Sequence, residues 1–153
     1  MAAPLIAPSA DDALLIEFYR RHWLEMGVGP AETRADWREL ALAFLTEARQ
    51  AGGFAGFVVR RDGIALGSAC ARPMPAAYPA FRDVDAVRVG YIWGLYVEPA
   101  ERGQGLGRRL VEACLAHLAA QGCGRALLHA GPRSLPLYAR LGFSETGEMA
   151  LKL

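Results

Sequence analysis

The most informative part of the chain reads Val97-Glu-Pro-Ala-Glu-Arg102-Gly103-Gln104-Gly105-Leu106-Gly107-Arg108-Arg109-Leu110. Three alternate glycines stand here between a predicted strand and the start of a helix with an apolar face. A glycine has no Cβ atom, so it can adopt a positive φ and let a bulky anion approach the backbone. The first N–H groups of a helix have no intrahelical partner, and the helix dipole adds partial positive charge. The segment therefore predicts a turn that binds pyrophosphate.

Two common pyrophosphate motifs do not fit this turn. A dinucleotide fingerprint needs a third glycine at its sixth position and an acidic residue about 20 positions later. Counted from Gly103 or Gly105, the sixth position holds Arg108 or Leu110. Residues 121–124, about 20 positions later, contain no carboxylate. The Gly-Lys-Ser/Thr of a Walker A loop is also missing. An ordinary tight turn between a strand and a helix, with no ligand, remains the alternative at this point.

The pattern of the rest of the chain predicts an α/β (α+β) fold. Two helices come first: one follows a capping box at Ser9–Asp12 and ends before Gly27, and the second covers residues 37–48. The further expected elements are a hairpin of strands 54–59 and 64–71 turning at 61–63, a strand 87–97, a helix 105–121, a strand 126–130, a helix 134–141 and a final strand 143–153. Gly90 and Gly94 inside a strand indicate a bulge or a close approach by another segment. This order predicts a mixed sheet with helices on both faces.

Composition limits the possible functions. A chain of 153 residues with 53% hydrophobic residues is expected to form one domain, residues 1–153. Its formal net charge is +1, so it shows no electrostatic signal for nucleic acid or an anionic membrane. The only lysine is Lys152, at the penultimate position. Schiff-base chemistry and phosphate-loop chemistry both need a lysine in a formed pocket, so the sequence argues against them.

Cysteine, histidine and the chain start give expectations about metals and location. The three cysteines form no CxxC pair and the three histidines are scattered, so no metal site is expected. Residues 1–10 carry no positively charged region of the kind that begins a signal peptide. No stretch of about 20 apolar residues is present to span a bilayer. The expectation is a soluble, reduced, cytoplasmic protein.

Two motifs resemble those of a known family. Arg102-x-x-Gly105-x-Gly107, preceded by Val97-x-Pro99 on a strand, is similar to the acyl-coenzyme A signature of the GNAT (Gcn5-related N-acetyltransferase) superfamily. Leu137-Tyr138-Ala-Arg-Leu-Gly142-Phe143 resembles the C-terminal Leu-Tyr-x-x-x-Gly-Phe of that family, at the expected separation. The resemblance covers essentially the whole chain. It implies a largely antiparallel twisted sheet with a central β-α pyrophosphate turn, in a bacterial small-molecule or protein acetyltransferase.

The resemblance also implies a site for acetyl-coenzyme A (acetyl-CoA). Tyr138 would direct its hydroxyl at the thioester sulfur as a proton donor. The pantetheine arm and the acetyl carbonyl would bind the main chain of Leu95, Tyr96 and Val97. The pyrophosphate would bind main-chain N–H groups of Arg102, Gly103, Gln104, Gly105, Leu106, Gly107 and Arg108.

This sequence departs from the family pattern at two places. Many relatives carry Asn seven residues before the tyrosine, where this chain has Gly131. Several relatives place a carboxylate base on the strand before the turn, but residues 91–97 contain none. Glu98 is interpreted as a solvated residue at the strand end, so a water chain could act as the base, or the amine could arrive partly neutral. His129 is either a structural histidine or a proton relay.

Three functions follow as hypotheses. The first is transfer of acetyl from acetyl-CoA to a primary amine, on a small molecule or a peptide, by direct attack in a ternary complex. The second is a non-catalytic acyl-CoA sensor or partner-binding module on the same fold. The third is a nucleotide-binding module with a chance resemblance. A homodimer is possible, and neither nucleic acid nor a membrane is expected as a partner.

The segment 73–86 is predicted to take part in the choice of acceptor, together with the first helix pair. It contains three prolines and has no clear period, which is typical of a functional or mobile loop. Tyr78 and Phe81 offer apolar walls. Asp83 and Asp85 would attract a cationic amine, or would be solvated turn residues.

Overall fold

A five-stranded sheet forms the centre of the computed structural model, which describes the backbone of residues 1–153 and all side chains except those of residues 84 and 85. Its strands are β1 (Leu5–Ser9), β2 (Ala55–Arg61), β3 (Ile64–Met74), β4 (Val89–Val97) and β5 (Arg125–Leu127). They lie in the order β1-β2-β3-β4-β5. Neighbouring strands are antiparallel except β4 and β5, which are parallel. The predicted mixed, largely antiparallel sheet is confirmed.

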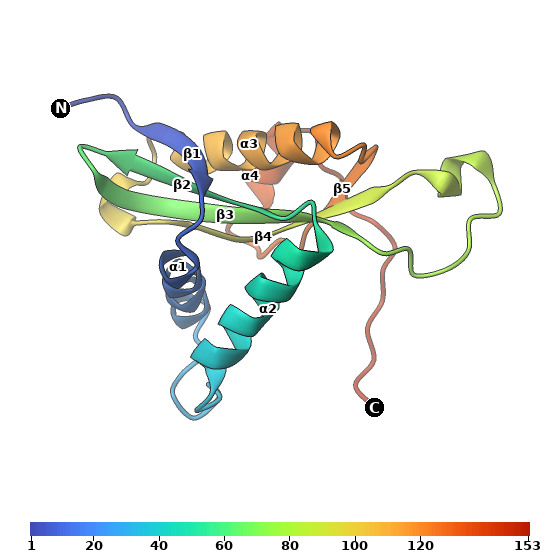
Figure 1. Cartoon of the computed structure of the whole chain (residues 1–153), viewed down its shortest axis with the longest axis horizontal. Helices are drawn as coiled ribbons and strands as arrows, with labels where there is room; N and C mark the ends of the chain where they lie inside the picture. Colours follow the sequence, from blue (N-terminus) through green and yellow to red (C-terminus); the bar gives the residue numbers. More distant parts are fainter.

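Helices cover both faces of the sheet, as predicted (Figure 1). They are α1 (Asp12–Glu25), α2 (Trp37–Ala51), α3 (Leu106–Ala120) and α4 (Leu135–Arg140), with short 3₁₀ turns η1 (Asp83–Ala86) and η2 (Pro99–Glu101). One core lies between α3 and the sheet and includes Leu110, Val111 and Cys114. The other lies between α1, α2 and the opposite face and includes Leu15 and Leu45. Two apolar helix faces thus bury the two faces of one sheet.

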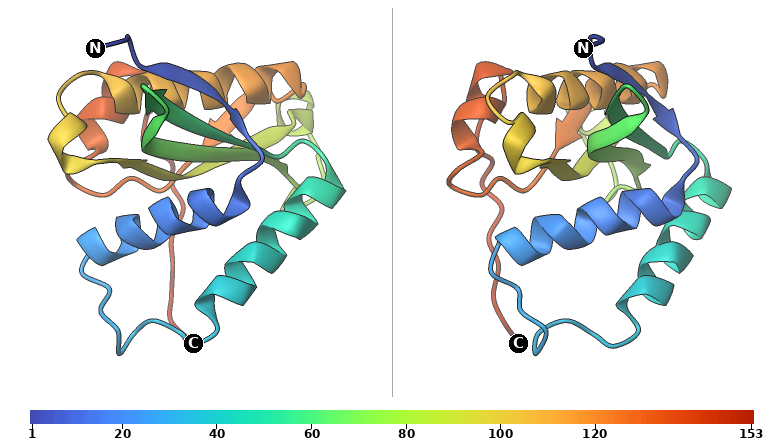
Figure 2. Two further views of the ribbon diagram at one scale, coloured as in Figure 1. Left: turned by 60° about the vertical axis from the view of Figure 1, so that its left-hand side comes forward. Right: turned by 90° about the vertical axis from the view of Figure 1, so that its left-hand side faces the viewer.

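The first two helices form a V on their side of the sheet (Figure 2). The first turn of α1 lies beside the last turn of α2, where Arg49 and Asp12 form an ion pair of 2.6 Å. From there the helices diverge toward the loop of residues 26–36 that joins them. No helix in the described part of the chain is long and apolar enough to cross a bilayer.

Glycine and turn residues have the predicted roles in the central strands. The β2–β3 hairpin turns at Asp62 and Gly63, both with positive φ (50° and 81°), as a tight two-residue turn requires. In β4, Gly94 and Leu95 lie opposite the single β3 residue between the pairs 68–96 and 70–93, which is a β-bulge. A Cβ at Gly90 would lie 2.5 Å from Leu118 of α3, so this glycine permits close packing of the helix.

The N-terminal segment differs from the expectation. Leu5–Ser9 pairs with β2 as an edge strand, which was not predicted. Its sequence, with Pro8 and few β-branched residues, carries a weak strand signal, and only pairing with β2 stabilises it. The predicted capping box at Ser9–Asp12 is also wrong in detail, because Asp11 is the cap and accepts a hydrogen bond from the Leu14 N–H at 3.0 Å.

The C-terminal part also differs. The strand predicted at 126–130 is shorter and ends at Leu127. The final strand predicted at 143–153 does not form, and the segment extends away from the sheet on the side of α1 and α2 (Figure 1). Met149, Leu151 and Leu153 are consequently exposed. An alternating pattern gives a strand only where a neighbouring edge accepts its hydrogen bonds, and this segment leaves the sheet without meeting one.

Candidate active site

Strands β4 and β5 separate halfway along β4. Their pairing ends at Tyr91 and Leu127, whereas β4 continues to Val97. In the described sheet, residues 92–97 therefore have no strand partner on this edge. Backbone N–H and C=O groups in such a gap are available to a ligand. The predicted residues Leu95, Tyr96 and Val97 lie here, with the bulge of Gly94 and Leu95 at the middle of the gap.

The glycine turn opens on solvent at the N-terminus of α3. Gly103 and Gly105 both have φ of +77°, and a Cβ added to either would meet no heavy atom within 4 Å. The first turn of α3 contains no acidic residue. Its free N–H groups thus meet open space and no nearby negative charge on the helix itself. The turn fits the pyrophosphate of a coenzyme, because the space that side chains would fill is available to an anion.

A hairpin residue holds this turn in place. Arg61, at the end of β2, donates hydrogen bonds to Glu101 at 2.7 Å and to Gln104 at 3.0 Å. Gln104 donates in turn to Glu101 at 3.1 Å. The Arg61 side chain is only 10% exposed, so this ion pair is shielded from solvent and fixes the turn without any ligand. On α3, Arg108 pairs with Glu112 at 2.8 Å, as their spacing predicts.

A cleft of about 2850 Å³ lies between the first helix pair, the end of β4 and α4. The sequence-predicted residues that line it are Leu95, Tyr96, Val97, Arg102, Gly103, Gly105, Leu106, Gly107, Arg108 and Tyr138. Gln104 is the predicted residue that does not line the cleft, since its side chain is used in the contact with Arg61. The fold thus brings together two motifs that lie 30 residues apart in the sequence.

Tyr138 lies on α4 with its ring inside the core and its hydroxyl at the cleft. The side chain is 7% exposed, and its ring lies 5.7 Å from that of Phe143. Burial, with a smaller contribution from Cys114, raises the pKa of Tyr138 to about 12. The Tyr138 hydroxyl has no hydrogen-bond partner among the described residues. Since none of their fully buried side-chain oxygens lacks a partner, this hydroxyl is not fully buried, and it opens on the cleft. This phenol is a proton donor across the physiological pH range.

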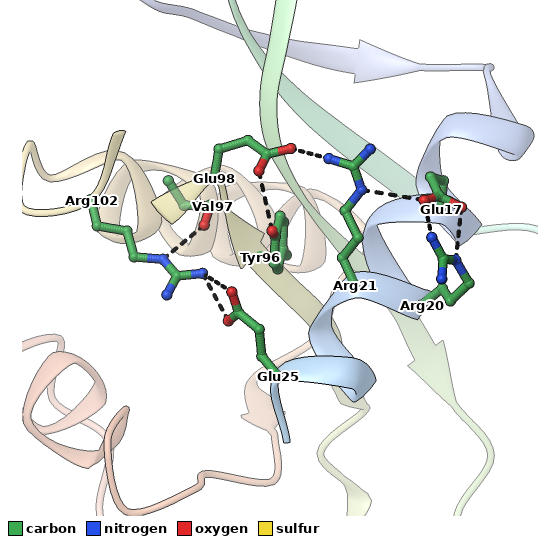
Figure 3. Close-up of polar contacts among 8 residues, drawn as sticks. All are labelled: Glu17, Arg20, Arg21, Glu25, Tyr96, Val97, Glu98 and Arg102. Atoms are coloured by element: carbon green, nitrogen blue, oxygen red, sulfur yellow. Dashed lines mark hydrogen bonds and ion pairs between the residues drawn. The ribbon is translucent and has the colours of Figure 1, made fainter. Parts of the chain in front are cut away.

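Helix α1 is tied to the turn through Arg102 (Figure 3). The Nε of Arg102 donates to the Val97 carbonyl at 2.8 Å. Its Nη2 donates to both carboxylate oxygens of Glu25 at 2.7 and 2.8 Å. The side chain therefore links the end of β4 to the last turn of α1. Glu25 lies far from Arg102 in the sequence, and nothing in the local pattern indicates the contact.

A second ion pair corrects the interpretation of Glu98. This residue was expected to be solvated, but it pairs with Arg21 of α1 and accepts a hydrogen bond from the Tyr96 hydroxyl at 3.2 Å (Figure 3). Its side chain is 27% exposed. The reason is that α1 crosses the end of β4 and brings a guanidinium to the carboxylate. Glu98 therefore helps to position the helix over the gap.

The last turn of α1 also reaches the loop before α4. A Cβ at Gly131 would lie 3.5 Å from the terminal methyl of Met26. Arg133 donates to the carbonyl of Glu25 at 3.4 Å. The end of α1 thus lies between the end of β4 and the loop before α4, and Met26 packs against Gly131.

The other side of the cleft is apolar. The rings of Phe44 and Trp93 meet edge to face at 5.8 Å, and Trp23, Leu40 and Phe44 remain partly exposed toward the cleft. Tyr78 of the 73–86 segment lines it, as predicted.

The expected electrostatic contribution of the 73–86 segment is not seen in the described side chains. Phe81 and Asp83 do not line the cleft, and Phe81 is 96% exposed. Asp85 lies outside the residues whose side chains the structure describes. The described charged residues around the cleft are mostly arginines, which favours anionic ligands. Of the side chains described, none form a group of three or more His, Cys, Asp or Glu that could hold a metal ion.

Comparison with known sequences identifies a family over most of the chain. Residues 15–143 match the model of the acetyltransferase (GNAT) family. The L-methionine sulfoximine/L-methionine sulfone acetyltransferase of Salmonella typhimurium is 30% identical over 94% of this chain and 80% of its own length. A match to the glucosamine 6-phosphate N-acetyltransferase 1 of Oryza sativa is local: it is 36% identical and spans about a third of each protein (38% of this chain, 35% of that one).

Solved structures agree with the fold. A GCN5-related N-acetyltransferase from Ralstonia eutropha superposes with a TM-score of 0.85 and 27% identity, covering 99% of both chains.

Proposed function

Because the chain belongs to the acetyltransferase (GNAT) family, we propose that it transfers the acetyl group of acetyl-CoA to a primary amine by direct attack in a ternary complex. One observation supports this above all others. The open glycine turn, the free edge of β4 and the hydroxyl of Tyr138 all face one cleft. This reaction needs a site for pyrophosphate, hydrogen-bond donors for a carbonyl oxygen and a proton donor for a thiolate.

In this proposal the chain supplies binding, polarisation and one proton. Main-chain N–H groups of residues 102–108 bind the pyrophosphate of acetyl-CoA. Main-chain groups of Leu95, Tyr96 and Val97 bind the pantetheine arm and donate to the acetyl oxygen, where negative charge develops during attack. Tyr138 donates its proton to the sulfur as the C–S bond breaks.

We propose a small-molecule or peptide amine as the acceptor, with its apolar part against Phe44 and Trp93. The relative from Salmonella typhimurium is named for amino-acid-like amines, so such compounds come first among the candidates. The whole chain, residues 1–153, is proposed to act as one unit. The cytoplasmic location and the homodimer stay predictions.

Binding and turnover measured separately test the proposal. Calorimetry measures binding of acetyl-CoA, CoA and ATP. Release of the CoA thiol is then followed against a panel of amino acids, polyamines, peptides and aminoglycosides, with mass spectrometry of the acetylated product. The expected result is binding of acetyl-CoA and acetylation of at least one amine. Binding without acetylation of any amine would favour a sensor, and preference for ATP would favour a nucleotide-binding module.

A further inference from the structure

We propose that His22 of α1 is the general base of this reaction and takes the proton that the acceptor nitrogen loses after it attacks the thioester. The inference rests on the proposed acetyl transfer and adds the group that the sequence does not reveal. No carboxylate lies on residues 91–97, and the carboxylate of Glu98 is engaged by Arg21 and Tyr96. A side-chain base must therefore come from another element that reaches the gap.

His22 lies where α1 crosses the bulge of β4. Its side chain is half-buried, lines the cleft and lies close enough to the backbone of Leu95 for that backbone to raise the pKa of the imidazole. One turn earlier on the helix, Tyr19 lies 3.4 Å from the position that a Cβ of Gly94 would take. The helix face that carries Tyr19 and His22 is thus packed on the part of β4 where the acetyl carbonyl is proposed to bind.

A neutral imidazole carries a hydrogen on one ring nitrogen and a lone pair on the other. The lone pair of His22 is available to a proton, because the described contacts of its ring are the indole of Trp23 and the backbone of Leu95. This is the arrangement that a general base requires.

Burial leaves His22 neutral near pH 7 despite the charges around it. Burial is the largest effect and lowers the pKa of His22, against smaller opposite effects of Glu25 and of the Leu95 backbone. Glu25 itself pairs with Arg102 from the turn, and Arg133 from the loop before α4 donates to its carbonyl. On the same helix the indole of Trp23 packs at 5.7 Å. The group is thus ready to accept a proton and does not already carry one.

The proton balance of the step is closed. The lone pair of the neutral amine forms the N–C bond, and the π electrons of the carbonyl move to its oxygen. When the carbonyl forms again, the C–S bond breaks and its electron pair stays on sulfur. His22 takes one proton from the nitrogen, and Tyr138 gives one proton to the sulfur. Transfer of the proton from His22 to Tyr138 through solvent restores both groups, and the products are the amide and the CoA thiol.

His129, the other histidine of the cleft, is less suited to this role. Its Nδ1 contacts the hydroxyl of Tyr91. Burial and the charge of Glu148 raise the pKa of Tyr91, so the phenol keeps its proton and donates it to Nδ1. Nδ1 of His129 is thus engaged by Tyr91 and is not free to take the proton of a substrate. The contact favours a structural histidine over a proton relay.

The test uses three variants and an acceptor that the wild-type protein acetylates. His22→Gln keeps a polar side chain at this position but accepts no proton, and His22→Ala leaves room for added imidazole. His129→Gln is the matched control. For each protein kcat is measured from pH 5 to pH 9 at saturating amine, because kcat reports groups of the bound complex. Thermal unfolding and calorimetry with acetyl-CoA are measured in parallel.

Wild-type kcat should fall about tenfold per pH unit below the pKa of His22, since the protonated ring cannot act as a base. His22→Gln should lower kcat about 10²-fold near pH 7.5 and remove this acid limb, with acetyl-CoA affinity unchanged. Imidazole should restore part of the activity of His22→Ala. His129→Gln should keep the acid limb of the pH profile of kcat.

Two results would overturn the role of His22 and leave the proposed acetyl transfer standing. One is an acid limb that persists in His22→Gln while the wild type acetylates its acceptor. The other is a limb lost in His129→Gln instead, which would make His129 the base. A wild-type protein that acetylates no amine would count against the proposed function itself, so the two failures are distinguishable.

Discussion

The carboxylate of Glu25 holds the guanidinium of Arg102 through two hydrogen bonds, 2.7 and 2.8 Å long, although the two residues lie 77 positions apart. Arg102 begins the turn proposed to bind pyrophosphate. A negative charge from α1 therefore lies beside the proposed anion site. A phosphate bound at the turn would compete with Glu25 for the guanidinium of Arg102.

Replacing Glu25 by glutamine should tighten coenzyme binding. Glu25→Gln removes a competitor for Arg102, and an exposed ion pair of this kind contributes about 0.2–1 kcal/mol. The dissociation constant for CoA should thus fall by a factor of about 1.4 to 5 in calorimetry at low salt. Glu112→Gln is the matched control: Glu112 pairs with Arg108 on α3, so this change also removes one negative charge from an arginine's partner. Equal tightening in both variants would show a general effect of net charge, and weaker binding by Glu25→Gln would contradict the competition.

Gly105 should be essential for binding beyond its effect on stability. Gly105→Val places a branched side chain in the open space of the turn and strains a φ of +77°. Gly122→Val makes the same change at the other end of α3, where φ is +76° and space is equally open. Both variants should lose stability, by more than about 1 kcal/mol each. Only Gly105→Val should weaken CoA binding, at least tenfold by calorimetry, and unchanged binding by the folded variant would exclude the turn as the pyrophosphate site.

Tyr138→Phe should separate turnover from binding. The change removes the proton donor and keeps the ring packed on Phe143, so kcat should fall about 10²-fold with the affinity for acetyl-CoA unchanged. The raised pKa of about 12 gives a further expectation for the wild type. The protonated phenol is the active form, and it persists until pH approaches that value. Ionisation of Tyr138 should therefore cause no loss of kcat below pH 10, and a full rate in Tyr138→Phe would argue against its role.

Phe44 should affect the acceptor and not the coenzyme. Its side chain is 47% exposed and meets Trp93 at the apolar wall, so Phe44→Ala should cost little stability. Loss of about 1 kcal/mol of apolar contact should raise the KM of an apolar amine about fivefold. Asp83→Asn, outside the cleft, should leave this KM unchanged. Steady-state kinetics at saturating acetyl-CoA measure both. A higher KM in Asp83→Asn alone would return the choice of acceptor to the 73–86 segment.

Features that depend on neighbouring residues could be predicted from the sequence. The Asp62-Gly63 hairpin turn, the bulge at Gly94 and the pair of Arg108 with Glu112 each follow from spacing or from backbone freedom over a few residues. The glycine turn and Tyr138 could be found because each lies in a short motif.

Features that depend on a distant partner could not be predicted. The strand at Leu5–Ser9 exists because β2 offers an edge, and the expected strand at 143–153 fails because no edge meets it. Glu98 changes from a solvated residue to a partnered one only when α1 crosses β4. His22 shares no motif with Leu95, and only the packing of the helix brings them together.

The part of β4 beyond Tyr91 is an edge strand that lies within the sheet and not at its rim. Unpaired N–H and C=O groups along an edge are a template for another extended chain, and proteins protect such edges with bulges, charges or covering elements. Here the bulge at Gly94 interrupts the row, and the side chain of Arg102 occupies the Val97 carbonyl. The end of α1, held by its ion pairs, lies above them. Weakening these contacts would expose the strand to pairing between molecules, so the elements that shape the cleft also protect the protein against aggregation.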